Sequence, residues 1–258
     1  MPEGAVAASA TVPTPGRAFS LPWETAVSLL VLAAIWEVAS LFAPPFAVPG
    51  WERIGRAVLG LPLDSVAITL ARVMVALVLS FAGGLAVAVA MYSVKPVERF
   101  GMPIVKLLMA VPVVCWILFA VLWFRWAEMR IAFVLVVVCA PVFIVDFLDG
   151  MKGVSKDLRD MMWSFRPTRA QFFSKLIIPG TLPVMFTSWK INLSLAIRVV
   201  TMAELVGATS GVGYGLVVAQ EVFSVAEVFA WTLVLVACLF ATEALVGYLE
   251  KRMLRWRV

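Results

Sequence analysis

The sequence predicts an all-α integral membrane protein with six transmembrane helices, both termini inside, and one long loop between the fourth and fifth helices. The 258 residues are 63% hydrophobic and only 14% charged, whereas soluble domains are about 45–50% apolar and about 25% charged. Apolar runs of about 20 residues, enough to cross the hydrocarbon core of a bilayer, recur along the chain. Alternating strands of a membrane barrel are absent, so helices that satisfy their own backbone groups are expected.

The chain divides into a polar tail and a membrane domain. Residues 1–20 are rich in Ala, Pro and Thr and are expected to form a disordered tail, and residues 21–258 form the domain. The predicted spans are 23–42, 65–92, 102–124, 130–148, 181–205 and 227–249. Pro103, Pro112 and Pro141 fall inside the third and fourth spans. Their kinks either serve helix packing or open a pathway through the bundle.

The distribution of positive charge sets the orientation. Most Lys and Arg lie at Arg17, around 95–99, in 152–175 and in 251–257, which are all on one side if both termini are inside. The loop after the fifth span has no Lys or Arg, and its charged residues are all acidic. Topology therefore explains the net charge of +5, and no nucleic-acid partner is expected.

The longest polar loop, residues 150–179, is basic and aromatic. Arg166 precedes Pro167, which disfavours helical geometry at Arg166. We therefore predict two short amphipathic helices along the membrane surface with a bend at 166–168. Such a loop either anchors to lipid headgroups or docks another protein, and composition does not separate these readings.

The same loop resembles the coupling-helix loop of a known family. Asp160, Met161 and Met162 occupy the frame of the EAA motif, followed at the family spacing by Arg166 and by the 176–179 segment ending in Pro179. The chain thus resembles the membrane subunit of bacterial ABC importers, of the type serving aliphatic sulfonates, taurine, nitrate or bicarbonate. Arg166 stands where the family has Gly, which is the main departure.

Further stretches carry the resemblance over residues 21–258. They are 35–37, 65–84, 112–124, 203–214 (AELVGATSGVGY) and 250–257. The resemblance implies a homodimer in the inner membrane of a bacterium, in contact with lipid, with a cytoplasmic ABC ATPase dimer and an extracytoplasmic substrate-binding protein as partners. It also implies ATPase-coupling residues in the loop: Asp160, Met161, Met162, Trp163, Phe165, Arg166, Pro167, Thr168, Arg169 and Phe172.

A translocation path is expected along the third and fifth spans and the segment that follows. Its candidate residues are Pro112, Trp116, Ser194, Arg198, Thr201, Glu204, Ser210 and Tyr214. The glycines at 207–215 indicate either tight helix packing or a short half-helix lining the path. Arg198 lies deep in a span, where it either pairs with Asp146 or contacts an anion. Arg72, near a span end, is interpreted as structural.

Enzyme chemistry has little support in the sequence. There is no His, and Cys115, Cys139 and Cys238 lie in apolar runs without metal-ligand spacing, so no metal site is predicted. No Lys precedes Ser or Thr, so the GxxxxGK[ST] motif is absent. ATP and Mg²⁺ are therefore expected on the partner ATPase, with no cofactor in this chain.

The predicted function is to form the path of an ATP-driven importer for a small solute. An organic or inorganic anion such as an alkyl sulfonate is favoured, and a neutral heterocycle such as a thiamine-pyrimidine precursor is the alternative substrate. An ion-coupled secondary transporter is the alternative class, but paired interrupted helices of an inverted repeat are not visible. A membrane-embedded enzyme is the third class of protein considered.

Overall fold

The computed structural model describes residues 23–44 and 46–253. The tail predicted at 1–20 lies outside these residues. The described chain forms helices joined by turns: α1 (Trp23–Phe42), α2 (Trp51–Gly60), α3 (Leu63–Ser93), α4 (Lys95–Ala110), α5 (Val113–Trp123), α6 (Ala127–Lys152), α7 (Lys156–Ser164), α8 (Arg169–Phe172), a π-helical turn (Phe173–Ile177), α9 (Ile178–Leu205), α10 (Val212–Glu221) and α11 (Val225–Met253).

The chain separates into two units after Gly50. In the first unit, α1 has no buried residue, and the indole of Trp36 donates a hydrogen bond of 3.1 Å to the Pro49 carbonyl of the turn that follows. The second unit, from Trp51 onward, contains the helical bundle and all the sites described below.

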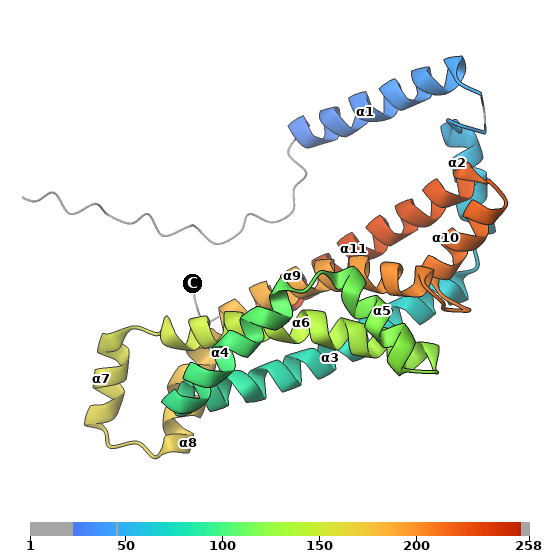
Figure 1. Cartoon of the computed structure of the whole chain (residues 1–258). Coiled ribbons are helices and arrows are strands. Elements are labelled where there is room, and N and C mark those ends of the chain that lie inside the picture. The colour runs from blue at the N-terminus through green and yellow to red at the C-terminus, as the bar shows by residue number, and fades with distance from the viewer. Residues whose placement is uncertain (1–22, 45, 254–258) are drawn as a thin grey trace, which may run out of the picture. The chain divides into compact units, whose positions relative to one another are not determined.

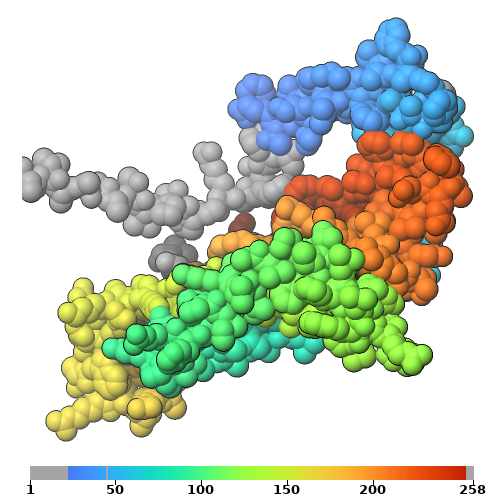
Figure 2. Space-filling model, in the orientation of Figure 1, coloured from blue at the N-terminus to red at the C-terminus, as the bar shows by residue number. Residues whose placement is uncertain are grey.

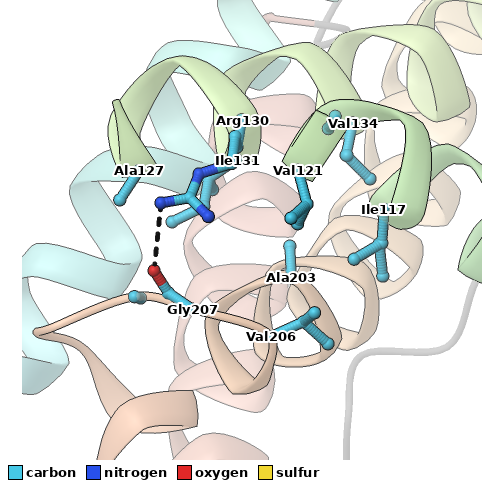
Figure 3. Close-up of a pocket in the computed structure, with 11 residues that line it drawn as sticks. Ile117, Val121, Ala127, Arg130, Ile131, Val134, Ala203, Val206 and Gly207 are labelled. Carbon is cyan, nitrogen blue, oxygen red and sulfur yellow. Dashed lines mark hydrogen bonds between the residues drawn. The ribbon is translucent and has the colours of Figure 1, made fainter. Parts of the chain in front are cut away.

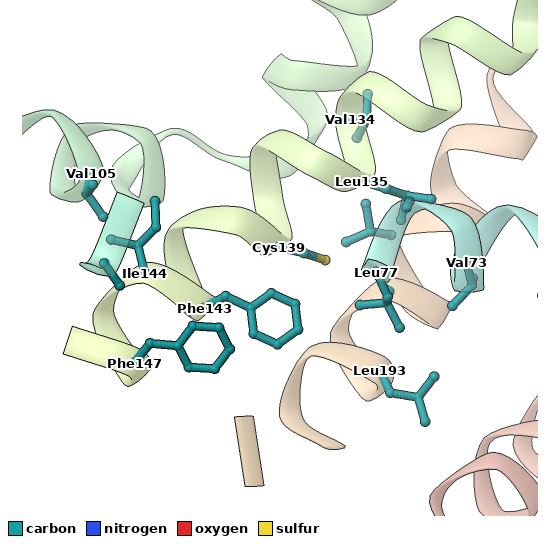
Figure 4. Close-up of a cluster of buried hydrophobic side chains, with 14 of the residues drawn as sticks. Val73, Leu77, Val105, Val134, Leu135, Cys139, Phe143, Ile144, Phe147 and Leu193 are labelled. Carbon is teal, nitrogen blue, oxygen red and sulfur yellow. The ribbon is translucent and has the colours of Figure 1, made fainter. Parts of the chain in front are cut away.

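The core of the bundle lies between α3, α6 and α9 (Figures 1 and 4). Phe81 of α3 joins the three helices, because its ring lies 5.1 Å from that of Phe147 on α6 and 5.3 Å from Trp189 on α9, centroid to centroid. Leu77 and Leu193 pack into the same apolar cluster. α4 and α5 cover α6, and α11 packs on α9 and α2.

The third predicted span, 102–124, is divided between two helices, α4 and α5. α4 and α5 meet at an angle of 93°. The break falls at Val111 and Pro112, both of which have extended backbone (ψ 125° and 139°). Pro112 lacks an N–H to continue the helix and disfavours helical geometry in the residue before it. The same effect is absent at Pro103 and Pro141, which lie inside α4 and α6.

The prediction of six membrane helices is confirmed in part. In the described residues, α1, α3, α6 and α11 are long and apolar enough to cross a membrane, and the bent pair α4–α5 makes up to five. α9 covers the predicted fifth span, but polar residues such as Ser188, Lys190 and Asn192 make it less apolar. Ser188 and Asn192 are buried, so these two groups face protein and not lipid, and Lys190 is partly exposed.

The two ends of the bundle differ. At one end α7 and α8 extend beyond the other helices, as the yellow segment of Figures 1 and 2 shows. At the other end lie α10, the start of α3 and the start of α6. The prediction of two short helices with a bend at 166–168 is confirmed, since α7 ends at Ser164 and α8 begins at Arg169.

Candidate functional site

The carboxylate of Glu204 is the centre of a buried polar network at the α10 end of the bundle. Glu204 lies in the last turn of α9 and is 1% exposed. Its carboxylate accepts hydrogen bonds from Arg72 Nη1 (2.6 Å), Thr69 Oγ1 (2.9 Å) and the Gly213 backbone N–H (2.8 Å). The charge is thus balanced by one guanidinium and distributed over three donors, as a buried carboxylate requires.

The network holds the first turn of α10 in place. The first N–H groups of a helix have no partner within the helix. Here Val212 N–H donates to Thr69 Oγ1 (2.9 Å), and Gly213 N–H donates to Glu204. Thr69 therefore accepts from α10 while it donates to Glu204, so α3, α9 and α10 meet at one hydroxyl and one carboxylate.

Two glycines permit this contact. Gly211 has φ +103°, and a Cβ there would overlap the Glu204 carboxylate. A Cβ on Gly213 would lie 2.5 Å from the Cβ of Glu204 and 2.6 Å from the Thr201 carbonyl oxygen. The glycine-rich stretch therefore provides tight packing and a turn into the short helix α10. That α10 lines a translocation path stays a prediction.

Arg72 extends the network to α6 and to the loop before α10. It forms a two-point ion pair with Glu128 in the first turn of α6, including an Nε–Oε2 distance of 2.9 Å. It also donates to the carbonyl (2.8 Å) and the hydroxyl (2.9 Å) of Ser210. The Arg72 side chain is 8% exposed and that of Glu128 is 67% exposed, so only the pair with Glu204 is fully shielded from solvent.

The opposite end presents the α7–α8 segment, residues 156–172, to solvent. Its exposed apolar residues are Leu158, Met161, Trp163 and Phe165, and Phe165 is 74% exposed. Arg166 has φ +50°, so it adopts the left-handed conformation that a Gly would take there. Thr168 then begins α8 in a capping box with Gln171. The bend of the family motif thus forms with Arg in place of Gly.

A chain of aromatic contacts connects α7 to the bundle. Trp163 of α7 lies 5.2 Å from Phe172, Phe172 lies 6.0 Å from Phe173, and Phe173 lies 5.7 Å from Tyr92 near the end of α3, all between ring centroids. Phe172 is buried although it lies in the exposed segment. The segment is therefore packed against the bundle through these rings as well as joined to it by the backbone.

The predicted path residues lie in three places. Glu204 and Ser210 both contact Arg72 in the buried network. Pro112 lies at the α4–α5 bend and Trp116 lies on α5 with its indole N–H buried and unpartnered among the described residues. The others are on α9 and α10: Ser194, Arg198, Thr201 and the exposed Tyr214.

The ion pair considered for Arg198 and Asp146 does not form. Asp146 accepts a hydrogen bond from Ser188, and Arg198 is exposed with its guanidinium donating to Ser194 Oγ at 3.2 Å. Arg198 lies on the exposed face of α9, whereas Ser188, which bonds Asp146, lies on the buried face. Arg198 and Asp146 therefore do not meet. Lys190 pairs with Glu250 of α11.

Sequence reasoning missed Thr69, Arg72 and Glu128 as members of the network. One signal was available: Arg72 is an ionisable residue in a predicted span, and such residues need a partner. The partner, Glu204, is 132 positions away, which the pattern of the sequence does not reveal. As for metals, the part of the chain that the structure describes holds no group of three or more His, Cys, Asp or Glu placed to bind one.

Together these features define a polytopic helical membrane protein with an exposed amphipathic segment at one end and a buried ion pair at the other. Residues 80–255 match the family model described as "binding-protein-dependent transport system inner membrane component". This match covers more than half of the chain, and the chain therefore belongs to that family.

Curated relatives agree with the family. The chain is 27% identical to the formylaminopyrimidine transport permease ThiX of Halalkalibacterium halodurans, over 91% of this chain and 96% of that one. It is 28% identical to the taurine transport system permease TauC of Escherichia coli, over 89% and 88%. It is 24% identical to the nitrate import permease NrtB of Synechococcus elongatus, over 83% and 81%.

Among solved structures, the fold is similar to a chain of the MetNI methionine ABC transporter in an inward-facing conformation. The TM-score is 0.64 with 19% identity, over 76% of this chain and 95% of that one. At this identity the likeness concerns the fold alone.

The protein is thus a multi-pass inner-membrane permease subunit of a binding-protein-dependent ABC importer. It is the transmembrane component and not the ATPase, and this family of subunits needs no cofactor of its own. A system of this kind also requires an ATPase and a substrate-binding protein, which are the partners of the chain.

Proposed function

We propose that two copies of this subunit enclose a path for a small organic or inorganic anion, such as an alkyl sulfonate. The observation that carries the proposal is the outer face of α9. Ile191, Arg198, Met202 and Leu205 recur at helical spacing and are exposed. An Arg on a helix that crosses a membrane does not face lipid; it faces a protein interior or a water-filled cavity.

A second copy of the chain supplies that interior. Covering the α9 face with the same face of a partner would remove its apolar residues from lipid and place Arg198 of each copy beside the path. Glu204, Ser210 and Tyr214 would then lie near the outer opening, and Pro112, Trp116, Ser194 and Thr201 along its wall. The relative named for nitrate supports an anionic solute, and the one named for taurine supports a solute that carries a sulfonate group.

The α7–α8 segment is proposed as the docking site of the ATPase. Asp160, Met161, Met162 and Arg166 fall on the frame of the family's coupling motif. The other proposed contact residues lie in the same segment: Trp163, Phe165, Pro167, Thr168, Arg169 and Phe172. Exposed apolar side chains at Met161, Trp163 and Phe165 offer a partner protein area to bury. The surrounding Lys and Arg support a cytoplasmic location for this end. Both termini are then inside.

Reconstitution tests the proposal. The chain, its ATPase and its binding protein are placed in proteoliposomes, and uptake of a labelled alkyl sulfonate, which is an anion, is compared with uptake of formylaminopyrimidine. We expect ATP-dependent uptake of the anion that an inactive ATPase abolishes. Arg198→Ala is expected to weaken this uptake with normal assembly, and Arg198→Lys to retain part of it. Uptake by the chain alone on an ion gradient would contradict the proposal.

A neutral heterocycle is the second candidate substrate. The relative named for formylaminopyrimidine is 27% identical over 91% of this chain, a likeness equal to that of the taurine permease. If it is the substrate, the same proteoliposomes take up formylaminopyrimidine and exclude the alkyl sulfonate, and Arg198→Ala leaves uptake unchanged.

A further inference from the structure

The turn between α10 and α11 carries an exposed aromatic side chain. Phe223 follows the end of α10, and 87% of its surface is exposed; its neighbour Val222 is 63% exposed. The turn lies at the end of the bundle opposite α7 and α8 (Figure 1). A single exposed apolar side chain is common on proteins, so exposure alone gives the ring no role.

The backbone of Phe223 adopts a conformation that disfavours its side chain. Its φ is +54°, in the left-handed region. Ser224 N–H donates to the Ala219 carbonyl at 2.9 Å, and Phe223 N–H donates to the Gln220 carbonyl at 3.0 Å. These two bonds are those of a Schellman motif, whose left-handed residue is usually Gly. A side chain at this position costs free energy, and a ring that is so exposed recovers little of that cost from contacts within the described chain.

The turn holds the backbone of Phe223 in one position. Ala219 on α10 and Trp231 on α11 are buried in one apolar cluster, so both helices that flank the turn are packed. The Ser224 carbonyl accepts from the N–H groups of Glu227 (3.1 Å) and Val228 (3.2 Å), so the first turn of α11 follows directly. A rigid turn lowers the entropy that is lost when an exposed group binds a partner.

A hollow at this end of the bundle is too small to receive a partner. The pocket that Arg130 and Gly207 border (Figure 3) has closed room for about one water molecule. Phe223, by contrast, projects from the surface. A partner that contacts this turn therefore receives the ring in a pocket of its own.

Charge around the turn selects the class of partner. Residues 199–250 contain no Lys or Arg, and Glu221 beside the turn is exposed. Aromatic anchors at a membrane surface are usually Trp or Tyr, and Lys and Arg favour contact with anionic lipids, so a Phe next to Glu does not fit a lipid anchor. A second copy that met this turn with its own turn would oppose two Glu221 carboxylates. An exposed aromatic ring with a polar rim is instead typical of an interface with a different protein.

We propose that Phe223 is an anchor for the substrate-binding protein and enters an apolar pocket on that protein, bordered by basic residues. The inference rests on the proposed function, because it takes the α7–α8 end to be cytoplasmic and the opposite end to face the binding protein. A binding-protein-dependent importer has such a partner. The turn offers it an apolar ring flanked by the exposed Gln220 and Glu221.

The first test identifies what contacts the ring. p-Benzoylphenylalanine replaces Phe223 in the complete transporter in proteoliposomes, and the binding protein that supports uptake is added before irradiation. We expect a cross-link to that protein. The matched control carries the same group in place of Phe100, which is 73% exposed on α4, and should give none. Cross-links from position 223 only to lipid or to a second copy, or no cross-link at all, overturn the inference.

The second test measures affinity and stability in the same variants. Phe223→Gly is expected to raise the Kd for the binding protein about tenfold or more, while the melting temperature rises because Gly takes the left-handed backbone without strain. Phe223→Tyr is expected to keep most of the affinity. An unchanged Kd in Phe223→Gly overturns the inference. A lower melting temperature also overturns it, because the ring would then stabilise the chain itself.

Thiol labelling separates this inference from the proposed function. Phe223→Cys in spheroplasts is treated with a reagent that does not cross membranes, and the unmodified chain gives the background from its own three cysteines. We expect labelling of intact spheroplasts. Labelling only after lysis shows that the turn faces the cytoplasm, so the proposed orientation is wrong and the inference fails with it. Labelling of intact spheroplasts together with an unchanged Kd in Phe223→Gly overturns the anchor alone.

Discussion

Replacing Glu204 by Gln tests whether the buried carboxylate holds α10 on the bundle. Glu204 accepts from Arg72, Thr69 and the Gly213 N–H. Gln has one acceptor oxygen in place of two and introduces an NH₂ group that is itself a donor. At least one of the three donors then faces another donor inside a site that is 1% exposed.

The size of the effect follows from those contacts. A hydrogen bond to a charged group contributes about 1.5–3 kcal/mol, and a buried group left unpaired costs a further 1–3 kcal/mol. We expect the free energy of local opening around α10 to fall by about 3 kcal/mol, which corresponds to about a hundredfold loss of protection, since each 1.4 kcal/mol is tenfold. Hydrogen exchange of the peptide that contains Gly213, followed by mass spectrometry, measures this protection.

Glu128→Gln is the matched control. Glu128 pairs with the same Arg72, but its side chain is 67% exposed, and exposed ion pairs contribute about 0–1 kcal/mol. Protection at Gly213 should therefore fall by less than about tenfold. If both substitutions reduce protection equally, or if Glu204→Gln leaves it unchanged, the buried carboxylate does not hold α10.

Three further substitutions, one of them with a control variant, probe other contacts. Gly213→Ala should destabilise the purified protein by about 1–3 kcal/mol, because the added Cβ overlaps neighbouring atoms. Gly83→Ala is the control and should stabilise the protein slightly, because nothing lies within 4 Å of its added Cβ. Thermal unfolding of the two variants compares their stabilities. Arg166→Gly should raise the melting temperature, because it relieves a left-handed residue at φ +50° that costs about 1–2 kcal/mol; no rise contradicts this. Phe173→Ala should break the ring contact with Tyr92 and reduce uptake per ATP hydrolysed, and an unchanged ratio means that the rings do not couple the two ends.

Local chemistry made much of the fold predictable. The apolar runs located α1, α3, α6 and α11 to within a few residues, because a helix in lipid must be apolar over a fixed length. Pro167 predicted the break between α7 and α8, since its effect on the preceding residue is local. The resemblance to the family covered the loop motif as well, and the family is confirmed.

The parts that failed depend on contacts between distant positions. Pro112 lies at a helix break and Pro141 lies inside a helix, although both interrupt apolar runs, so the presence of a proline did not predict which span would divide. Arg72 was interpreted as a residue near a span end, yet it joins α3, α6 and α9 through carboxylates 56 and 132 positions away. Composition identified Arg198 as an unusual charge but gave no means to choose its partner.

α9 connects the two candidate sites through one continuous helix. It begins directly after the π-helical turn that follows α8, and it ends one residue after Glu204. At 1.5 Å per residue its 28 residues span about 42 Å, so it crosses the whole bundle. We therefore expect a displacement of α7–α8 to move Glu204 as part of a rigid element, which would strain its bonds to Thr69 and Arg72 on α3. Spin labels on α8 and α10 would report the two movements; if α8 moves during ATP hydrolysis while the α10 distance to α3 stays fixed, α9 does not transmit the motion.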